Sequence, residues 1–101
     1  MEVLPMPAYI TLLRWTSQGS QNIKESPSRL DAARKAFDAV GVKLKDFYMV
    51  TGRYDMVIIT EAPDDVALAK ATLSIASKGS VQTETLRAFT EDEYRKIISG
   101  L

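Results

Sequence analysis

The sequence lacks both cysteine and histidine among its 101 residues. Without cysteine the chain cannot form a disulfide, a thiolate nucleophile, an iron–sulfur cluster or a cysteine zinc site. Without histidine it has neither the usual general base of catalysis nor the commonest protein ligand of metals and haem. These two absences exclude most standard catalytic and metal-binding sites, and we predict neither a metal site nor a bound cofactor.

The chain also lacks an excess of charge of either sign and a long apolar run. Thirteen basic and thirteen acidic residues cancel, and the lysines and arginines are scattered. Nucleic acids and anionic membranes both attract clustered positive charge, so neither is an expected partner. No stretch approaches the roughly 20 apolar residues of a membrane span, and the first residues do not have a signal-peptide pattern. We therefore expect a cytoplasmic location.

The composition that remains, 46% hydrophobic and 26% charged, is that of an ordinary globular protein. The length suits one domain with a modest core. Met6 and Pro7 resemble a second start of the chain. We expect residues 1–5 to be a short N-terminal extension and residues 6–101 to form the domain.

Hydrophobic periodicity and turn residues predict four strands and three main helices. The strands are rich in β-branched and aromatic residues, whereas the helices have apolar stripes at helical spacing. In the fourth strand every second residue is polar, which is typical of a sheet edge or a cavity wall. The expected strands are residues 8–15, 43–51, 54–62 and 81–89, and the expected helices begin near Ser28, near Asp64 and at Thr90.

Capping residues mark the ends of these helices. Ser28 is followed by Asp31 at the spacing of a capping box, and Gly41 supplies the stop of that helix. Thr90 and Glu93 form a better capping box for the last helix. The acidic residues at the helix starts are therefore explained by capping and the helix dipole rather than by metal binding.

The order strand, helix, strand, strand, helix, strand, helix is that of an α+β ferredoxin-like βαββαβ domain with a C-terminal helix. Right-handed crossovers place both main helices on one face of a four-stranded antiparallel sheet. The middle strands nevertheless carry apolar residues on both faces, and leaving them in water would forgo several kcal/mol at about 25 cal/mol per Å². We therefore expect two sheets to pair face to face in a homodimeric α/β barrel.

The turn between the second and third strands contains Gly52, Arg53, Tyr54 and Asp55. Gly52 marks a sharp reversal, and the next three residues bring a cation, a phenol and an anion to one strand end. They could form a binding or catalytic corner, with Tyr54 or Asp55 transferring protons and Arg53 clamping an anion. A structural role, with Asp55 capping the turn, is the interpretation that the residues favour. Alternation predicts that at most one of Tyr54 and Asp55 faces an intersheet cavity, unless a bulge re-aims the other.

A second candidate site combines polar and aromatic residues of the first, second and fourth strands. Phenols, hydroxyls and guanidinium groups among apolar walls are typical of a small-molecule pocket. Packing at a dimer interface explains the same residues equally well. The polar segment 22–27 is either a lid over the barrel mouth or, as we favour, a connection into the first long helix. The candidate residues are Tyr9, Arg14, Trp15, Tyr48, Thr83, Thr85 and Arg87.

Several blocks spread from Met6 to the end of the chain form one pattern: MPAYI at 6–10, NIKESP at 22–27, RL at 29–30, FY at 47–48, GRYD at 52–55, EAPDD at 61–65 and TETLRAF at 83–89. Together they resemble the GYD-domain family, although Arg53 stands between the glycine and tyrosine of that signature. The resemblance implies a ferredoxin-like dimeric α/β barrel, with a distant likeness to the ligand-binding domains of Lrp/AsnC regulators. It implies no assigned biochemical role.

Three functions are compatible with these residues. We favour a homo-oligomeric small-molecule-binding or sensing module whose ligand, a small organic molecule, lies between sheets or between dimers. The first alternative is a cofactor-independent oxygenase or isomerase acting on a phenolic or enolisable substrate, in which Tyr48, Arg53, Tyr54 and Asp55 transfer protons and stabilise an anion. The second alternative is a purely structural oligomerisation subunit. Whether the chain is an enzyme stays open, and its expected partner is a second copy of itself.

Overall fold

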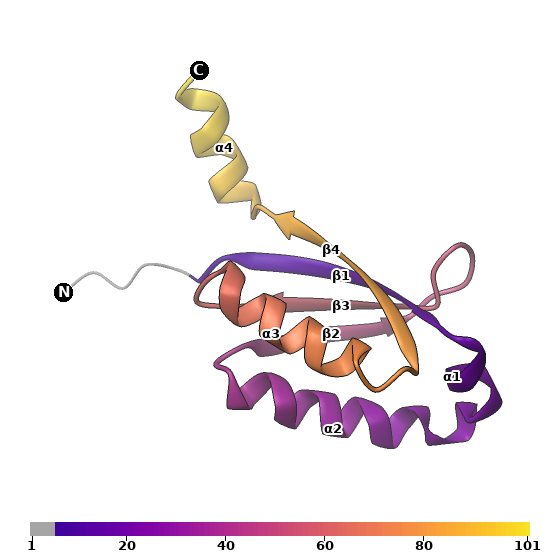
Figure 1. Cartoon of the computed structure of the whole chain (residues 1–101). Coiled ribbons are helices and arrows are strands. Elements are labelled where there is room, and N and C mark those ends of the chain that lie inside the picture. The colour runs from indigo at the N-terminus through magenta and orange to yellow at the C-terminus, as the bar shows by residue number, and fades with distance from the viewer. Residues whose placement is uncertain (1–5) are drawn as a thin grey trace.

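The computed structural model describes residues 6–101, so the expected extension at residues 1–5 lies outside the described residues. The described chain is an α+β ferredoxin-like βαββαβ domain followed by a C-terminal helix, which confirms the predicted fold class (Figure 1). The elements are β1 Ala8–Trp15, α1 Ser17–Gln21, the 3-10 helix η1 Ile23–Glu25, α2 Ser26–Ala39, β2 Lys43–Met49, β3 Met56–Glu61, α3 Asp65–Ala76, β4 Val81–Ala88 and α4 Glu91–Ser99.

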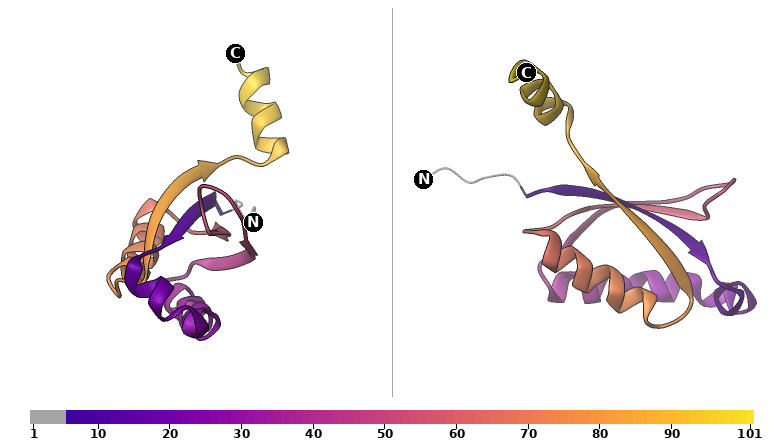
Figure 2. Two further views of the ribbon diagram at one scale, coloured as in Figure 1. Left: turned by 90° about the vertical axis from the view of Figure 1, so that its right-hand side faces the viewer. Right: turned by 45° about the horizontal axis from the view of Figure 1, so that its top comes forward.

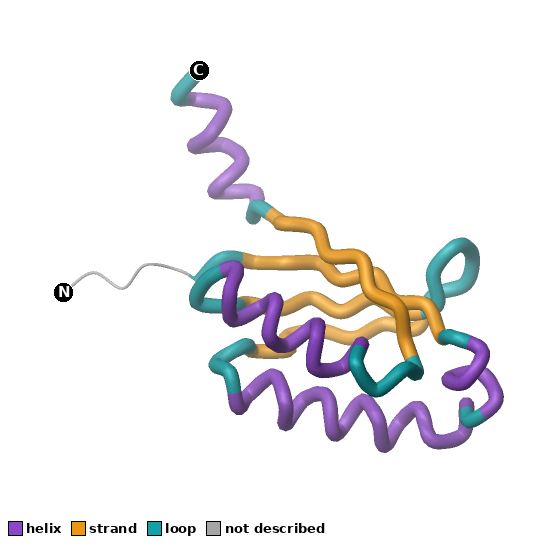
Figure 3. Tube along the Cα trace, in the orientation of Figure 1, coloured by secondary structure: helices purple, strands orange, loops and turns teal. Residues whose placement is uncertain are grey.

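The four strands form one antiparallel sheet in the order β2-β3-β1-β4, shown in orange in Figure 3. β1 is central, and its Thr11 lies opposite Ile58 of β3 and Thr85 of β4. β4 is an edge strand, as its polar alternation predicts. On the other edge, a register shift in β2 between Leu44 and Asp46 interrupts the alternation. The bulge lets both Leu44 and Phe47 pack against the core.

Both long helices, α2 and α3, cover the same face of the sheet, and among the described residues no helix covers the other (Figures 1 and 2). Odd-numbered residues of β1 and even-numbered residues of β3 point to the helices. They form the core together with residues that come from or adjoin α2 and α3. The buried members are Tyr9, Leu13, Phe37, Val42, Met56, Ile58, Ala62, Leu68 and Ala71.

The predicted start of the first long helix is wrong. α2 begins at Ser26, and Pro27 occupies its first turn, where a fixed φ suits the helix and the missing N–H has no role. The hydroxyl of Ser28 donates to the carbonyl of Glu25 at 2.8 Å instead of capping a later N–H. The 3-10 helix η1 leads directly into α2, so the chain does not need the Ser28–Asp31 capping box.

The later helix starts agree with the predictions. The carboxylate of Asp64 accepts the N–H of Ala67 at 2.8 Å and caps α3. Thr90 and Glu93 form the reciprocal capping box of α4, with the Thr90 N–H donating to the Glu93 carboxylate at 2.9 Å. This bond is the main reason that the pKa of Glu93 is lowered. Beyond this cap α4 projects away from the sheet (Figure 1). None of the described helices is long and apolar enough to cross a membrane.

Candidate functional site

The loop between β2 and β3 is longer than the turn that the sequence predicts. β2 ends at Met49 and β3 begins at Met56, so the expected ends at residues 51 and 54 fall in the loop. The loop is closed by the N–H of Val50, which donates to the carbonyl of Asp55 at 2.8 Å. Gly52 has φ of +126°, a conformation that side chains disfavour. Figure 3 shows this loop extending beyond the end of the sheet.

Asp55 ties the loop to the central strand. Its N–H donates to the carbonyl of Leu13 at 2.9 Å, and its carboxylate accepts the N–H of Trp15 at 2.9 Å. These bonds continue the pairing of β1 and β3 past the last ladder pair, Leu13 with Met56. The carboxylate of Asp55 is therefore engaged in holding the backbone, which is the arrangement expected of a structural residue.

Tyr54 lies on the face of the sheet that α2 and α3 leave open. Its hydroxyl donates to the carboxylate of Glu84, and the guanidinium of Arg14 lies 4.9 Å from the centroid of its ring. The pKa of Tyr54 is raised, above all because its phenol donates this hydrogen bond to Glu84. At neutral pH Tyr54 is thus a proton donor, which disfavours a role as a tyrosinate base. We call Arg14, Tyr54 and Glu84 the open-face cluster.

The open-face cluster borders a shallow hollow of about 210 Å³. Leu12 provides an apolar wall, while Gln82 adds an amide to the cation, phenol and carboxylate of the cluster. Arg14 pairs with Gln82, and Leu12 pairs with Glu84, in the register of β1 and β4. Sequence reasoning missed Gln82 and Glu84 because it chose the odd-numbered residues of the fourth strand. Both residues could have been identified by aligning the first and fourth strands as antiparallel neighbours, which places Gln82 opposite Arg14.

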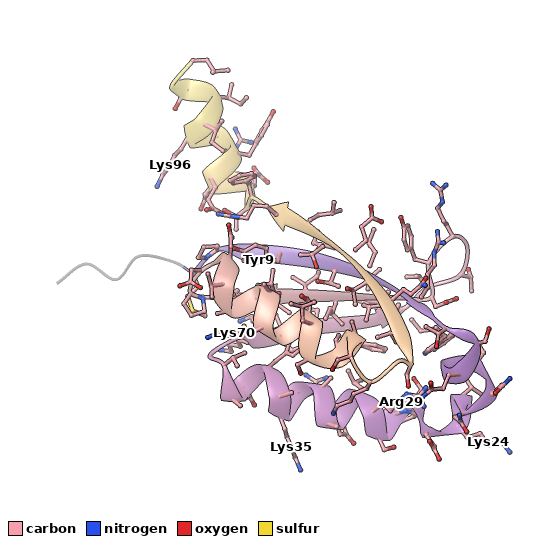
Figure 4. All side chains as sticks on the ribbon, viewed as in Figure 1. Tyr9, Lys24, Arg29, Lys35, Lys70 and Lys96 are labelled. Carbon is pink, nitrogen blue, oxygen red and sulfur yellow. The ribbon has the colours of Figure 1, made fainter. Side chains whose placement is uncertain are left out.

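The helix-covered face holds a second cluster, near the start of α3. The hydroxyl of Tyr9 donates to the carboxylate of Asp65, which is the main reason that the pKa of Tyr9 is raised. Figure 4 shows Tyr9 in this position. The guanidinium of Arg87 lies 5.5 Å from the Tyr9 ring centroid and 4.5 Å from that of Phe89. Nη1 of Arg87 also donates to the carbonyl of Ala8 at 3.2 Å. The contacts fasten β4 and the start of α3 to β1.

The structure does not bring the seven residues of the second predicted site together. Paired residues of antiparallel strands share a face, so odd residues of β1 align with odd residues of β4 beneath the helices. Thr85, for example, bonds to Thr11 through their hydroxyls at 3.1 Å. The register assigns Tyr9, Trp15, Thr83, Thr85 and Arg87 to the helix-covered face, and Arg14 and Tyr48 to the open face. Of the first group, Thr83 also borders the hollow of the open face.

The remaining candidates lie apart from both clusters. Tyr48 is 57% exposed on β2, which β3 and β1 separate from β4. Arg53 is exposed in the loop. The segment 22–27 contains η1 and the first residues of α2, and Nη1 of Arg29 donates to the carbonyl of Asn22 at 2.9 Å, which ties it to α2. Within residues 6–101, no group of three or more acidic side chains is placed to hold a metal ion.

Comparison with known families decides where this chain belongs, because the family model of the GYD domain matches residues 9–98. The chain belongs to the GYD-domain family. A curated relative of this GYD-domain chain is the "Glutamine synthetase and cystathionine beta-lyase binding protein" of Thermus thermophilus. The two are 37% identical over 84 residues, which cover 82% of this chain and 88% of the relative.

Solved structures agree with the fold of the GYD-domain chain. The crystal structure of TTHA0845 from Thermus thermophilus has a TM-score of 0.55 at 29% identity, covering 84% of this chain and 95% of that one. MtbAldR has a TM-score of 0.66 at 14% identity, with 90% of this chain and 60% of that chain covered. FFRP-DM1 has a TM-score of 0.55 at 21% identity, with 83% and 100% covered. At these identities, the similarity to MtbAldR and FFRP-DM1 shows a shared fold alone.

Proposed function

We propose that this GYD-domain chain is a homo-oligomeric small-molecule-binding or sensing module that dimerises through the open face of its sheet. The observation that carries the proposal is the apolar character of that face. Ile10, Leu12, Val57 and Ile59 are only half-buried in the single chain, while Leu86 is 46% exposed. Pairing the sheets of two copies would remove these side chains from water.

A second sheet would also cover the hollow beside Arg14, Tyr54 and Glu84. A polar small molecule there would meet a guanidinium, a phenol that donates and a carboxylate that accepts. Covering such groups with a second sheet strengthens their electrostatic interactions with a ligand, since water is excluded. This arrangement supports binding and recognition. The raised pKa of Tyr54 disfavours the alternative of an oxygenase or isomerase that uses this phenol as its base.

The ligand is tested by thermal unfolding in the presence of amino acids, aromatic acids and other small anions. A compound present at about 100 times its dissociation constant should stabilise the folded chain by about 2.7 kcal/mol. The dissociation constant of the compound should rise at least fivefold in Glu84→Gln. Glu91→Gln, which changes an exposed acidic residue of α4, should bind the compound as wild type does. Failure of every compound to raise the unfolding temperature would contradict the proposal.

A second candidate function is that of a protein-binding accessory module, which includes the purely structural role expected as an alternative. The relative named for binding glutamine synthetase and cystathionine β-lyase favours it. In this chain α4 presents Tyr94, Ile97 and Ile98, each about half exposed, on a helix that projects from the sheet. Such a helix suits docking into an apolar groove. Binding of either purified enzyme, lost in Ile97→Asp and retained in Lys96→Asp, would support this function.

A further inference from the structure

The guanidinium of Arg14 borders the hollow of the open face with donors that the chain does not use. Within residues 6–101 it has no ion pair and no side-chain hydrogen bond, and it lies over the ring of Tyr54, 4.9 Å from the centroid. Contact with a ring uses the charge of a guanidinium and leaves most of its five N–H donors available. A carboxylate matches two of these donors at once, so Arg14 favours a carboxylate ligand.

The same hollow contains an acceptor, the carboxylate of Glu84. Its Oε2 accepts the phenol of Tyr54, while its Oε1 accepts no hydrogen bond in the described part of the chain. Two carboxylates repel each other, so a ligand carboxylate at Arg14 requires a donor group on the side of the ligand that faces Glu84. Arg14 and Glu84 both contact the side chain of Tyr54, so the two ligand groups must lie close together.

The balance of charge selects a hydroxyl rather than an ammonium as that donor. The lining of the hollow contains one cation and one anion, Arg14 and Glu84. Arg53 lies outside the lining, yet its charge reaches the same phenol. The hydrogen bond to Glu84 is the main cause that raises the pKa of Tyr54, whereas the positive charges of Arg53 and Arg14 act to lower it. Two cations and one anion therefore surround the phenol, and this net positive charge suits a monoanion better than a zwitterion.

The size of the hollow and its apolar wall restrict the rest of the ligand. At about 210 Å³ the hollow is smaller than the roughly 300–1,000 Å³ of sites for drug-sized ligands, so the ligand is small. We propose that the hollow binds a short aliphatic α-hydroxy acid, whose carboxylate pairs with Arg14, whose hydroxyl donates to Glu84 and whose hydrocarbon chain lies against Leu12. This ligand class rests on the small-molecule function proposed above, because the site is the same hollow.

Four compounds with one carbon skeleton test the proposal by isothermal titration calorimetry of the full chain at neutral pH. α-Hydroxyisocaproate has both groups, isocaproate lacks the hydroxyl, α-hydroxyisocaproamide lacks the charge, and leucine has an ammonium in place of the hydroxyl. The dissociation constant of α-hydroxyisocaproate should be about tenfold lower than that of each other compound, since each lacks one matched hydrogen bond or charge.

The failure of this ligand class is distinguishable from the failure of the proposed function. If other compounds of the thermal unfolding screen bind while α-hydroxyisocaproate binds no better than isocaproate or the amide, the ligand class is wrong and the small-molecule function stands. Tighter binding of leucine would also overturn the ligand class, since the site would then select a zwitterion. If no compound of either series binds, both proposals are wrong.

Substitutions of the two charged residues provide a second test. Arg14→Gln should raise the dissociation constant of α-hydroxyisocaproate about tenfold and remove its preference over the amide. Glu84→Gln should instead reduce the preference over isocaproate and keep the preference over the amide. Arg34→Gln, at an exposed position of α2, is the control and should bind as wild type. An unchanged dissociation constant in Arg14→Gln would overturn the proposal.

Sedimentation of each variant separates a lost ligand contact from a lost dimer. If Arg14→Gln does not dimerise as the wild type does, Arg14→Lys decides, because lysine keeps the charge and loses the two-point geometry. Arg14→Lys should bind α-hydroxyisocaproate several-fold more weakly and still prefer it to the amide. Equal affinity of Arg14→Lys and wild type would contradict the pairing of the ligand carboxylate with this guanidinium.

Discussion

The residues of the Gly-Arg-Tyr-Asp loop make separate contacts in the structure. Gly52 allows the backbone to turn at φ of +126°. Asp55 bonds to the N–H of Trp15, while Tyr54 bonds to Glu84 on the open face. The sequence predicted that Tyr54 and Asp55 would diverge, because strand residues alternate. It did not predict Glu84, since the partner of Tyr54 comes from β4 and depends on strand register.

Replacing Asp55 should destabilise the domain. Asp55→Ala leaves the N–H of Trp15 without its charged acceptor, and hydrogen bonds to charged groups contribute about 1.5–3 kcal/mol. We therefore expect a loss of about 2 kcal/mol in the free energy of unfolding, measured by urea denaturation. Asp31→Ala, at an exposed position of α2, is the control and should stay within about 0.5 kcal/mol of wild type. Equal free energies of unfolding for the two variants would show that Asp55 does not stabilise the domain through this bond.

The raised pKa of Tyr54 gives a pH prediction at the same scale. Because the fold favours the protonated phenol, its contribution to stability is complete below the ordinary value of 10.0 and is lost as pH rises through the raised pKa. Glu84→Gln removes the accepting carboxylate, so Tyr54 should ionise at lower pH in this variant. The measurement is the tyrosinate absorbance of wild type and variant, each corrected by subtraction of its Tyr54→Phe counterpart. Coincident curves would show that Glu84 does not hold the phenol.

At the scale of the elements, strands with strong patterns were predicted well and helix starts less so. The range of β1 is confirmed to the residue because prolines precede a run of β-branched and aromatic residues. The predicted start of α2 was wrong because Ser28 resembles an N-cap in the sequence. In the structure η1 leads directly into α2, and Pro27 already lies in its first turn. The bulge in β2 was not predicted, since Lys43 to Asp46 has no local signal of a register shift.

The packing of α1 against the loop before β4 predicts an intolerant glycine. A Cβ added at Gly19 would lie 2.1 Å from the backbone carbonyl oxygen of Ser80, closer than any real contact. Gly19→Ala must therefore displace backbone, and we expect a loss of about 2 kcal/mol or more in the free energy of unfolding. At Gly100 the nearest atoms to such a Cβ are 3.6 Å away. Gly100→Ala should be neutral, and a similarly mild effect of Gly19→Ala would contradict the close approach.

The capping box of α4 predicts a pH-dependent helix end. Since the pKa of Glu93 is lowered, its contribution is complete above the ordinary value of 4.5 and is lost as pH falls through the lowered pKa. The amide resonances of α4 should therefore report fraying at acidic pH in the wild type. Glu93→Gln should remove most of this pH dependence, whereas Asp92→Asn, outside the capping box, should keep it. A pH profile unchanged in Glu93→Gln would exclude Glu93 as the titrating group.

At the scale of the whole molecule, the sheet divides the domain into two unlike sides. The helix-covered side contains the core and a pocket lined in part by Trp15, whereas the open side combines half-buried aliphatic residues with the open-face cluster. The right-handed crossovers of the two βαβ halves allowed the helix layer on one face of the sheet to be predicted from sequence. The division of the candidate site between the two faces was missed, because it depends on which residues of β1 and β4 lie opposite each other.

Self-association through the open face is the central proposal, and sedimentation equilibrium of the purified chain tests it most directly. At micromolar concentration we expect the wild type to have the mass of two chains. Ile59→Glu places a charge on the open face and should yield monomers, while Leu73→Glu, at a 68% exposed position on α3, should remain a dimer. A wild-type chain that sediments as a stable monomer, or dissociation by Leu73→Glu alone, would contradict dimerisation through the open face.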